Sequence, residues 1–182
     1  MSRFCCCPAA RWLPLCICDC MKNKTFSKTQ KLTFSAIVAA AYMAIMFATQ
    51  GFAFGAYQIR IATALYALAY PFPFLLLPLA LANSMSNVLG GLGVFDIVGG
   101  FLVGVVTAGI VALLRVTKCP AFFTIFPIIL GPGLIVPLWL SGITGIPYWA
   151  LVVNISIGQT VPAVFGYIII RELNKRRIAG NE

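Results

Sequence analysis

The sequence predicts an all-α integral membrane protein, folded as a compact bundle of six transmembrane helices. Apolar residues make up 61% of its 182 residues and charged residues 9%, whereas soluble domains are about half apolar and about a quarter charged. Between positions 32 and 170 the chain carries four charged residues: Arg60, Asp96, Arg115 and Lys118. Because so few charges cannot cover the surface of a water-soluble globule, this stretch belongs in lipid.

The basic residues are concentrated at the two ends of the chain. Of the 13 Lys and Arg residues, six precede Leu32 and four follow Ile170, and the net charge is +9. Lys and Arg beside membrane spans mark the cytoplasmic side. We therefore expect a multi-pass protein of the cell membrane with both termini in the cytoplasm and no nucleic-acid partner. The predicted division is a basic, Cys-rich cytoplasmic tail (1–31), a membrane domain (32–172) and a second basic cytoplasmic tail (173–182).

The N-terminal tail contains six of the seven cysteines: Cys5, Cys6, Cys7, Cys16, Cys18 and Cys20. Thiols in the cytoplasm are kept reduced, and the CCC and C-x-C-x-C runs lack the paired C-x-x-C spacing of a zinc site. Met21 begins a basic segment, Met-Lys-Asn-Lys, that can precede the first span without residues 1–20. We therefore expect residues 1–20 to be non-functional or absent from the native protein.

The first three predicted spans lie in the N-terminal half, where each needs about 20 apolar residues to cross about 30 Å of hydrocarbon. The first runs from residue 32 to about residue 52. The uncharged stretch 61–87 contains Pro71, Pro73 and Pro78. Because proline interrupts helical hydrogen bonding, we divide this stretch near Pro71 into a second and a third span.

The fourth predicted span covers about 94–116, the fifth 120–140 with an interruption at 131–133, and the sixth follows Pro147 to residue 170. Two cytoplasmic termini require an even number of spans, which the division near Pro71 provides. Six spans place Arg115 on the cytoplasmic side and put Arg60 and Asp96 on the outer side, where an importer first meets its ligand.

Motifs for catalysis and cofactor binding are missing from the sequence. There is no G-x-x-x-x-G-K-[ST] loop for ATP, there is no histidine, and Asp96 is the one acid between Asp19 and Glu172. Paired carboxylates, a Ser-His-Asp triad and histidine metal ligands are thus excluded within the membrane domain. We expect no enzymatic activity, no metal and no cofactor.

The few polar side chains inside the predicted third and last spans include the amides of Asn83, Asn87, Asn154 and Gln159. Asn83 and Asn87 are four residues apart and therefore share one helix face. Amides at membrane depth either join helices to one another or face a cavity, where their donors and acceptors suit the edge of a planar heterocycle. Each amide taken singly favours the first role, and the set near Arg60 and Asp96 favours a ligand pocket.

Arg60 and Asp96 have a second interpretation, as interfacial anchors or as an ion pair, and Trp149 with Tyr148 is typical of an aromatic belt. Neither interpretation excludes a place in the pocket. The sequence therefore predicts a substrate site formed by Gln58, Arg60, Asn83, Asn87, Asp96, Trp149 and Gln159.

Alanines recur every four residues along the first span, at Ala36, Ala40 and Ala44. Small residues at this spacing let another helix approach closely in lipid. The partner helix is either a neighbouring span of the same chain or a second subunit, and the pattern favours the two equally.

Two segments carry a family resemblance: FGAYQIR at 54–60, followed by Ala64-Leu65, and NVLGGLGVFD at 87–96, followed by Gly99. They resemble the QueT family of substrate-binding (S) subunits of energy-coupling factor (ECF) transporters, and the resemblance extends over about 35–172. It implies six membrane helices and a partnership with a transmembrane coupling subunit, on which the alanine stripe docks, and with two ATPase subunits. It also implies uptake of queuosine precursors, which are 7-deazaguanine bases.

This chain departs from the family pattern at two positions, because Thr63 and Gln159 stand where the pattern carries glutamate. A buried carboxylate would pair with the ammonium of an aminomethyl precursor. Its replacement favours the uncharged cyano precursor or another neutral heterocycle. We therefore expect the substrate-capture subunit of an ECF importer, and the alternative is a membrane-embedded enzyme or a structural membrane protein unrelated to transport.

Overall fold

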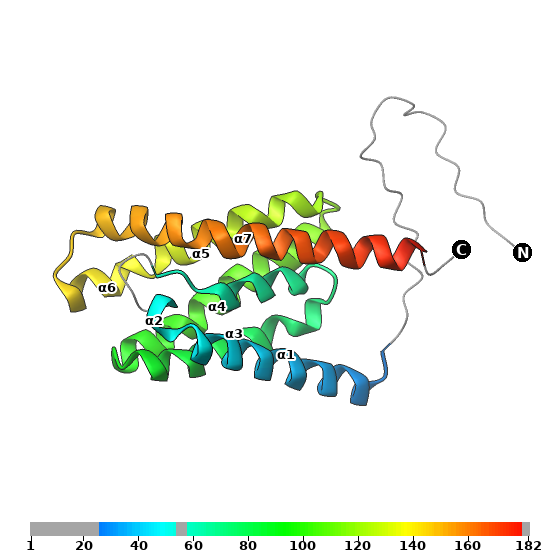
Figure 1. Ribbon diagram of the computed structural model, residues 1–182, viewed down its shortest axis with the longest axis horizontal. Coiled ribbons are helices and arrows are strands. Elements are labelled where there is room, and N and C mark those ends of the chain that lie inside the picture. Colours follow the sequence, from blue (N-terminus) through cyan, green and yellow to red (C-terminus); the bar gives the residue numbers. More distant parts are fainter. Residues whose placement is uncertain (1–25, 54–57, 180–182) are drawn as a thin grey trace, which may run out of the picture.

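The computed structural model describes residues 26–53 and 58–179, and every regular element in them is helical. Figure 1 shows the long helices lying side by side along one axis. The α-helices are α1 (Lys28–Ala48), α2 (Gln50–Ala53), α3 (Leu76–Asn87), α4 (Val94–Val116), α5 (Ile125–Ile135), α6 (Pro137–Thr144) and α7 (Tyr148–Ala179). The 3-10 helices are η1 (Ile61–Ala69), η2 (Pro73–Leu75), η3 (Val88–Gly90) and η4 (Ala121–Thr124).

Five segments of the described chain are long and apolar enough to span a membrane: Lys28–Ala48, Pro73–Gly90, Val94–Val116, Ala121–Thr144 and Tyr148–Lys175. They agree with the predicted membrane bundle, but the predicted count of six is not confirmed. The predicted second span is η1, which has nine residues. A 3-10 helix rises about 2 Å per residue, so η1 is too short to cross the hydrocarbon layer by itself.

The short helix η1 packs inside the bundle against α7, α4 and α1. Seven of its nine residues are buried, and four of these seven are alanines. Helix α7 passes close to it at Gly166, where a Cβ atom would lie 2.8 Å from the carbonyl oxygen of Ala64. Small side chains on both elements therefore allow the close contact that holds η1 at the centre.

Both described ends of the chain lie at the same end of the bundle (Figure 1). Phe34 of α1 stacks edge-on against Phe72 at 5.2 Å between ring centroids, and Arg115 near the end of α4 donates to the carbonyl oxygen of Pro71. The opposite end holds residues 58–60, the end of α3 and the beginning of α4. This arrangement agrees with an even number of passes, while the side of the membrane on which the termini lie stays a prediction.

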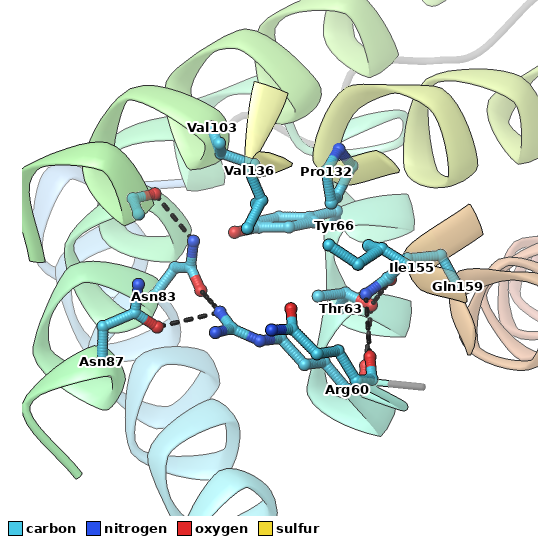
Figure 2. Close-up of a pocket in the computed structure, with 12 residues that line it drawn as sticks. Arg60, Thr63, Tyr66, Asn83, Asn87, Val103, Pro132, Val136, Ile155 and Gln159 are labelled. Atoms are coloured by element: carbon cyan, nitrogen blue, oxygen red, sulfur yellow. Dashed lines mark hydrogen bonds between the residues drawn. The ribbon is translucent and has the colours of Figure 1, made fainter. Parts of the chain in front are cut away.

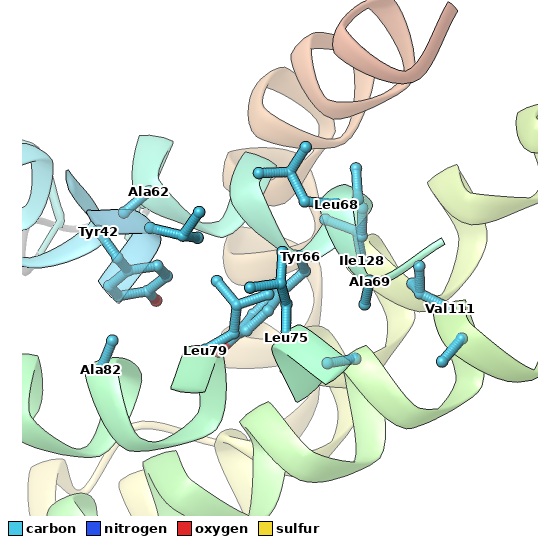
Figure 3. Close-up of a cluster of buried hydrophobic side chains, with 14 of the residues drawn as sticks. Tyr42, Ala62, Tyr66, Leu68, Ala69, Leu75, Leu79, Ala82, Val111 and Ile128 are labelled. Carbon is cyan, nitrogen blue, oxygen red and sulfur yellow. The ribbon is translucent and has the colours of Figure 1, made fainter. Parts of the chain in front are cut away.

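The core consists of small, aliphatic and aromatic side chains around η1 (Figure 3), including Tyr42, Tyr66, Leu75, Leu79 and Ile128. Many of the largest apolar side chains instead face outward, among them Phe47, Val94 and Phe95. The buried residues in turn include Arg60, Asn83, Asn87, Asp96 and Gln159. An apolar exterior around a polar interior is the arrangement expected of a helical bundle in lipid.

The predicted interruption of the fifth span at 131–133 is wrong, because α5 continues through Pro132. The glycines beside Pro132 instead allow close packing. A Cβ atom at Gly131 would lie 2.3 Å from Thr107 Oγ1, and one at Gly133 would lie 2.5 Å from Ser156 Oγ. The chain begins a new helix five residues after Pro132, at Pro137, whose missing N–H is tolerated at a first helical position.

Two predicted boundaries shift in the structure. Helix α1 begins at Lys28 rather than at Leu32, because Ser27 and Gln30 form a reciprocal capping box. Helix α7 continues to Ala179 and so includes most of the predicted C-terminal tail. The cysteines of the N-terminal tail, with residues 1–25, lie outside the described residues.

Candidate ligand-binding site

A small cavity lies between η1, α3, α4, α5 and α7, near the end of the bundle opposite the termini (Figure 2). Its volume is about 10 Å³, which is about that of one water molecule. The described residues that line it are Gln58, Arg60, Thr63, Tyr66, Asn83, Asn87, Gly100, Val103, Pro132, Val136, Ile155 and Gln159. Polar side chains form one side of the cavity and aliphatic ones the other.

Arg60 is the charged group of this lining and is only 5% exposed. It directly precedes η1, and its guanidinium extends toward the end of α3 (Figure 2). Its Nη1 donates to Asn87 Oδ1 at 2.8 Å and to Asn83 Oδ1 at 3.4 Å. The hydroxyl of Tyr42 on α1 donates to the same Asn83 oxygen at 2.9 Å, so three elements meet at Asn83.

The two asparagines also hold α3 against α4. Asn83 Nδ2 donates to the carbonyl oxygen of Gly100 at 2.7 Å, and Asn87 Nδ2 donates to that of Asp96 at 2.8 Å. A Cβ atom at Gly100 would lie 2.3 Å from Asn87 Nδ2, so the glycine is what lets the amide reach across. The amides therefore join helices through their nitrogens and face Arg60 through their oxygens, which combines the two predicted roles.

A second polar wall connects η1 to α7. Thr63 Oγ1 lies 2.7 Å from Gln159 Oε1 and 2.7 Å from the carbonyl oxygen of Arg60, and its single proton is donated to one of them at a time. Gln159 Nε2 donates to the carbonyl oxygen of Gln58 at 3.5 Å. Thr63 and Gln159, where the family resemblance leads us to expect glutamate, thus contact each other in the wall of the cavity.

Asp96 is buried in the first turn of α4 but does not line the cavity. Its Oδ1 accepts a hydrogen bond from Trp139 Nε1 at 3.1 Å, and its Oδ2 has no hydrogen-bond partner among the described residues. The Trp139 ring packs onto α4 where Gly99 has no side chain. Asp96 therefore lies behind Asn87, bonded to Trp139, rather than in the position predicted for a group that contacts ligand.

The structure thus brings together five of the predicted site residues: Gln58, Arg60, Asn83, Asn87 and Gln159. Trp149 is not among them, since its side chain is 72% exposed and contacts the ring of Tyr148. Sequence reasoning missed Tyr66 and Trp139, because an aromatic residue inside an apolar run gives no signal that separates a site residue from the core.

The alanine stripe of α1 faces outward, since Ala36, Ala40 and Ala44 are all exposed. Two of them border an apolar groove of about 410 Å³ between α1 and α3. Its lining is Leu32, Ser35, Ala36, Ala39, Ala40, Met43, Pro78, Leu81, Ala82 and Met85. The stripe is therefore not covered by a neighbouring helix of the described chain.

A family model described as QueT transporter matches residues 32–175, which is most of the chain. The chain belongs to the QueT transporter family. Its five apolar spans agree with a multi-pass membrane protein, and membership of a transporter family supports a transport role. Neither a curated protein nor a solved structure matches the chain.

Proposed function

We propose that this QueT family member is the substrate-capture subunit of an ECF-type importer for a queuosine precursor or a similar 7-deazaguanine-type heterocycle. The observation that carries the proposal is the buried polar lining around Arg60, Asn83, Asn87 and Gln159 on one side of a single cavity. Burying polar groups at membrane depth costs free energy, so such groups are usually kept for a function. Guanidinium and amide groups match the ring nitrogens and carbonyl of such a base.

The charge of the lining favours an uncharged ligand. Among the described residues the lining holds one charged side chain, Arg60, and no carboxylate, because Asp96 lies behind Asn87 and Thr63 and Gln159 form a neutral pair. An ammonium group placed there would meet a cation and no anion. The cyano precursor is therefore the better fit than the aminomethyl one.

Binding requires the cavity to widen. A bicyclic base is many times larger than about 10 Å³. The aliphatic side includes Val103 on α4, Val136 between α5 and α6, and Ile155 on α7. Side-chain rotation and small helix shifts on this side make room without breaking the hydrogen bonds of Arg60. We propose that the polar side of the cavity is preformed, and that the aliphatic side moves outward to admit the ligand and then packs against it.

Ligand identity is tested by calorimetry on the full chain in detergent. We expect the cyano deazaguanine to bind at least about tenfold more tightly than the aminomethyl form, since one missing charge partner costs at least about 1.4 kcal/mol. Guanine, which has a ring nitrogen in place of the substituted C7, reports recognition of the aminopyrimidinone ring that the three bases share. A wild-type protein that binds none of the three contradicts the proposed substrate class.

Energy comes, in this proposal, from two ATPase subunits joined to the chain through a transmembrane coupling subunit. The exposed alanines and the groove between α1 and α3 offer the docking surface, since small residues permit close helix approach in lipid.

Ala40→Trp is expected to abolish co-purification with the coupling subunit while ligand affinity stays within about threefold of wild type. Leu102→Trp on α4, which is also exposed, is the matched control and should assemble normally. Normal assembly of Ala40→Trp would place the docking surface elsewhere.

A further inference from the structure

The hydroxyl of Tyr66 is a buried polar group that the hydrogen-bond network of the cavity does not use. Tyr66 lies on η1, its exposed fraction is 0%, and its hydroxyl has no hydrogen-bond partner among the described residues. Figure 2 shows its ring extending between the aliphatic side chains of Val103 and Val136 and the polar group around Arg60 and Asn83. The unpartnered hydroxyl therefore belongs to the lining of the cavity.

Its immediate neighbours show that this hydroxyl differs from the others nearby. The ring of Tyr42 lies 5.9 Å from that of Tyr66, and its hydroxyl is bonded to Asn83 Oδ1. On the other side α4 approaches closely, because a Cβ atom at Gly104 would lie 3.2 Å from the Tyr66 hydroxyl and 2.7 Å from Ala80 Cα. The described elements around it thus enclose the Tyr66 hydroxyl, and none of their residues forms a hydrogen bond with it.

Burial of an unsatisfied hydroxyl weakens a fold, and a phenylalanine would fill the same space without that cost. The folded structure alone therefore gives no reason for the oxygen. We propose that the Tyr66 hydroxyl is a ligand-binding group, which hydrogen-bonds a ring nitrogen or carbonyl of the bound heterocycle. This inference rests on the proposed function and adds Tyr66 to Arg60 and the amides as a determinant of specificity.

Thr107 provides a matched control. Its Oγ1 is also buried and unpartnered among the described residues, but Thr107 does not line the cavity. Thr107→Val exchanges that hydroxyl for a methyl group of similar size, as Tyr66→Phe removes the phenolic oxygen. The two variants differ in whether the lost hydroxyl faces the cavity.

The experiment titrates the cyano deazaguanine and guanine against wild type, Tyr66→Phe and Thr107→Val by calorimetry, and measures thermal unfolding without ligand. We expect Tyr66→Phe to weaken binding roughly five- to hundredfold while its melting temperature does not fall. Thr107→Val should keep its affinity within about threefold of wild type. Tyr42→Phe, which removes a bonded hydroxyl, is the benchmark for destabilisation.

Two results would overturn the role of Tyr66. Affinity of Tyr66→Phe within about threefold of wild type means that the hydroxyl meets only water. A loss of stability as large as that of Tyr42→Phe, or failure to fold, means that it is bonded within the protein. If wild type binds neither probe, the proposed function fails and the role of Tyr66 fails with it. If wild type and Tyr66→Phe bind equally well, only the role of Tyr66 fails.

Discussion

Two arginines lie at opposite ends of η1 and make different kinds of contact. Arg60 precedes the helix and donates to the side-chain amide oxygens of Asn83 and Asn87. Arg115, on α4, donates to the main-chain carbonyl oxygens of Tyr70 and Pro71, just beyond the last residue of η1. The first arginine is buried in the cavity lining, and the second is half-buried.

The helix dipole separates the two roles. A cation is favourable near the C-terminal end of a helix, where carbonyl groups lack partners, and unfavourable near the N-terminal end. Arg115 is therefore explained by the fold, because it caps the carbonyls after η1. Arg60 precedes η1, but its guanidinium extends to Asn83 and Asn87 on α3, so it bonds side chains of the cavity lining rather than the unpaired carbonyl groups of η1. We expect substitutions at the two positions to affect binding and stability separately.

The largest effect is expected for Arg60→Met. Loss of the guanidinium removes charge-assisted hydrogen bonds in a buried site, which are worth up to about 3 kcal/mol, so ligand affinity should fall by about a hundredfold. Calorimetry with the cyano deazaguanine measures it. Arg115→Met, the same substitution at the other end of η1, should leave affinity within about threefold. Equal losses of affinity in both variants would end the distinction.

Asn87→Ala should have a smaller effect on the same measurement. It removes the acceptor that orients Arg60 and the donor to the carbonyl oxygen of Asp96. One lost partner costs about 1–3 kcal/mol, so affinity should fall roughly five- to hundredfold. Ser84→Ala, which also removes a bond from α3 to α4 but lies outside the lining, controls for loosening of the helix pair. Equal affinity losses in both would reduce Asn87 to a packing role.

Arg115→Met should change stability instead of affinity. Its removal leaves the carbonyl oxygens of Tyr70 and Pro71 without this donor, and hydrogen bonds from a charged group contribute about 2 kcal/mol. Thermal unfolding of the ligand-free protein should therefore begin at lower temperature than in wild type. An unchanged melting temperature would show that Arg115 does not cap η1.

The smallest effect on the neutral ligand is expected for Asp96→Asn. Asparagine keeps an oxygen that accepts from Trp139 Nε1, and Asp96 does not line the cavity. Affinity for the cyano deazaguanine should stay within about threefold of wild type. A much larger loss, above all for the aminomethyl form, would show that the carboxylate turns into the cavity when ligand binds.

The sequence predicted the bounds of α4 to the residue, because an apolar run with Asp96 as its one charge lies between the glycines at 90–93 and the basic group at 115–118. It did not predict that η1 is a 3-10 helix. It also did not predict the close approach of α7 to η1 at Gly166, which no local pattern reports. Five of the seven predicted site residues line the cavity, because charged and amide residues are rare in the apolar block and each one stands out.

Trp139 and Trp149 mark the limit of such reasoning. Trp139 lies on α6 and Trp149 at the beginning of α7, both among apolar residues of the sequence. Trp139 nevertheless donates a hydrogen bond to Asp96, whereas Trp149 faces outward. Which indole faces inward depends on the rotation of α6 and α7 about their axes, and this is set by packing against distant segments.

Composition and the position of charges by themselves determined that the chain lies in a membrane, which segments are apolar enough to span it, and which few polar residues need an explanation. These properties follow from the hydropathy and charge of residues that are neighbours in the sequence, because the free-energy cost of placing a charge in lipid is large wherever the charge occurs. Only the tertiary structure decided the pairs, such as Thr63 with Gln159 across 96 positions of sequence. It also left the Tyr66 hydroxyl in the cavity lining without a hydrogen-bond partner in the part of the chain that the structure describes. Such pairs depend on ångström-scale helix approach, which follows from all the packed side chains together.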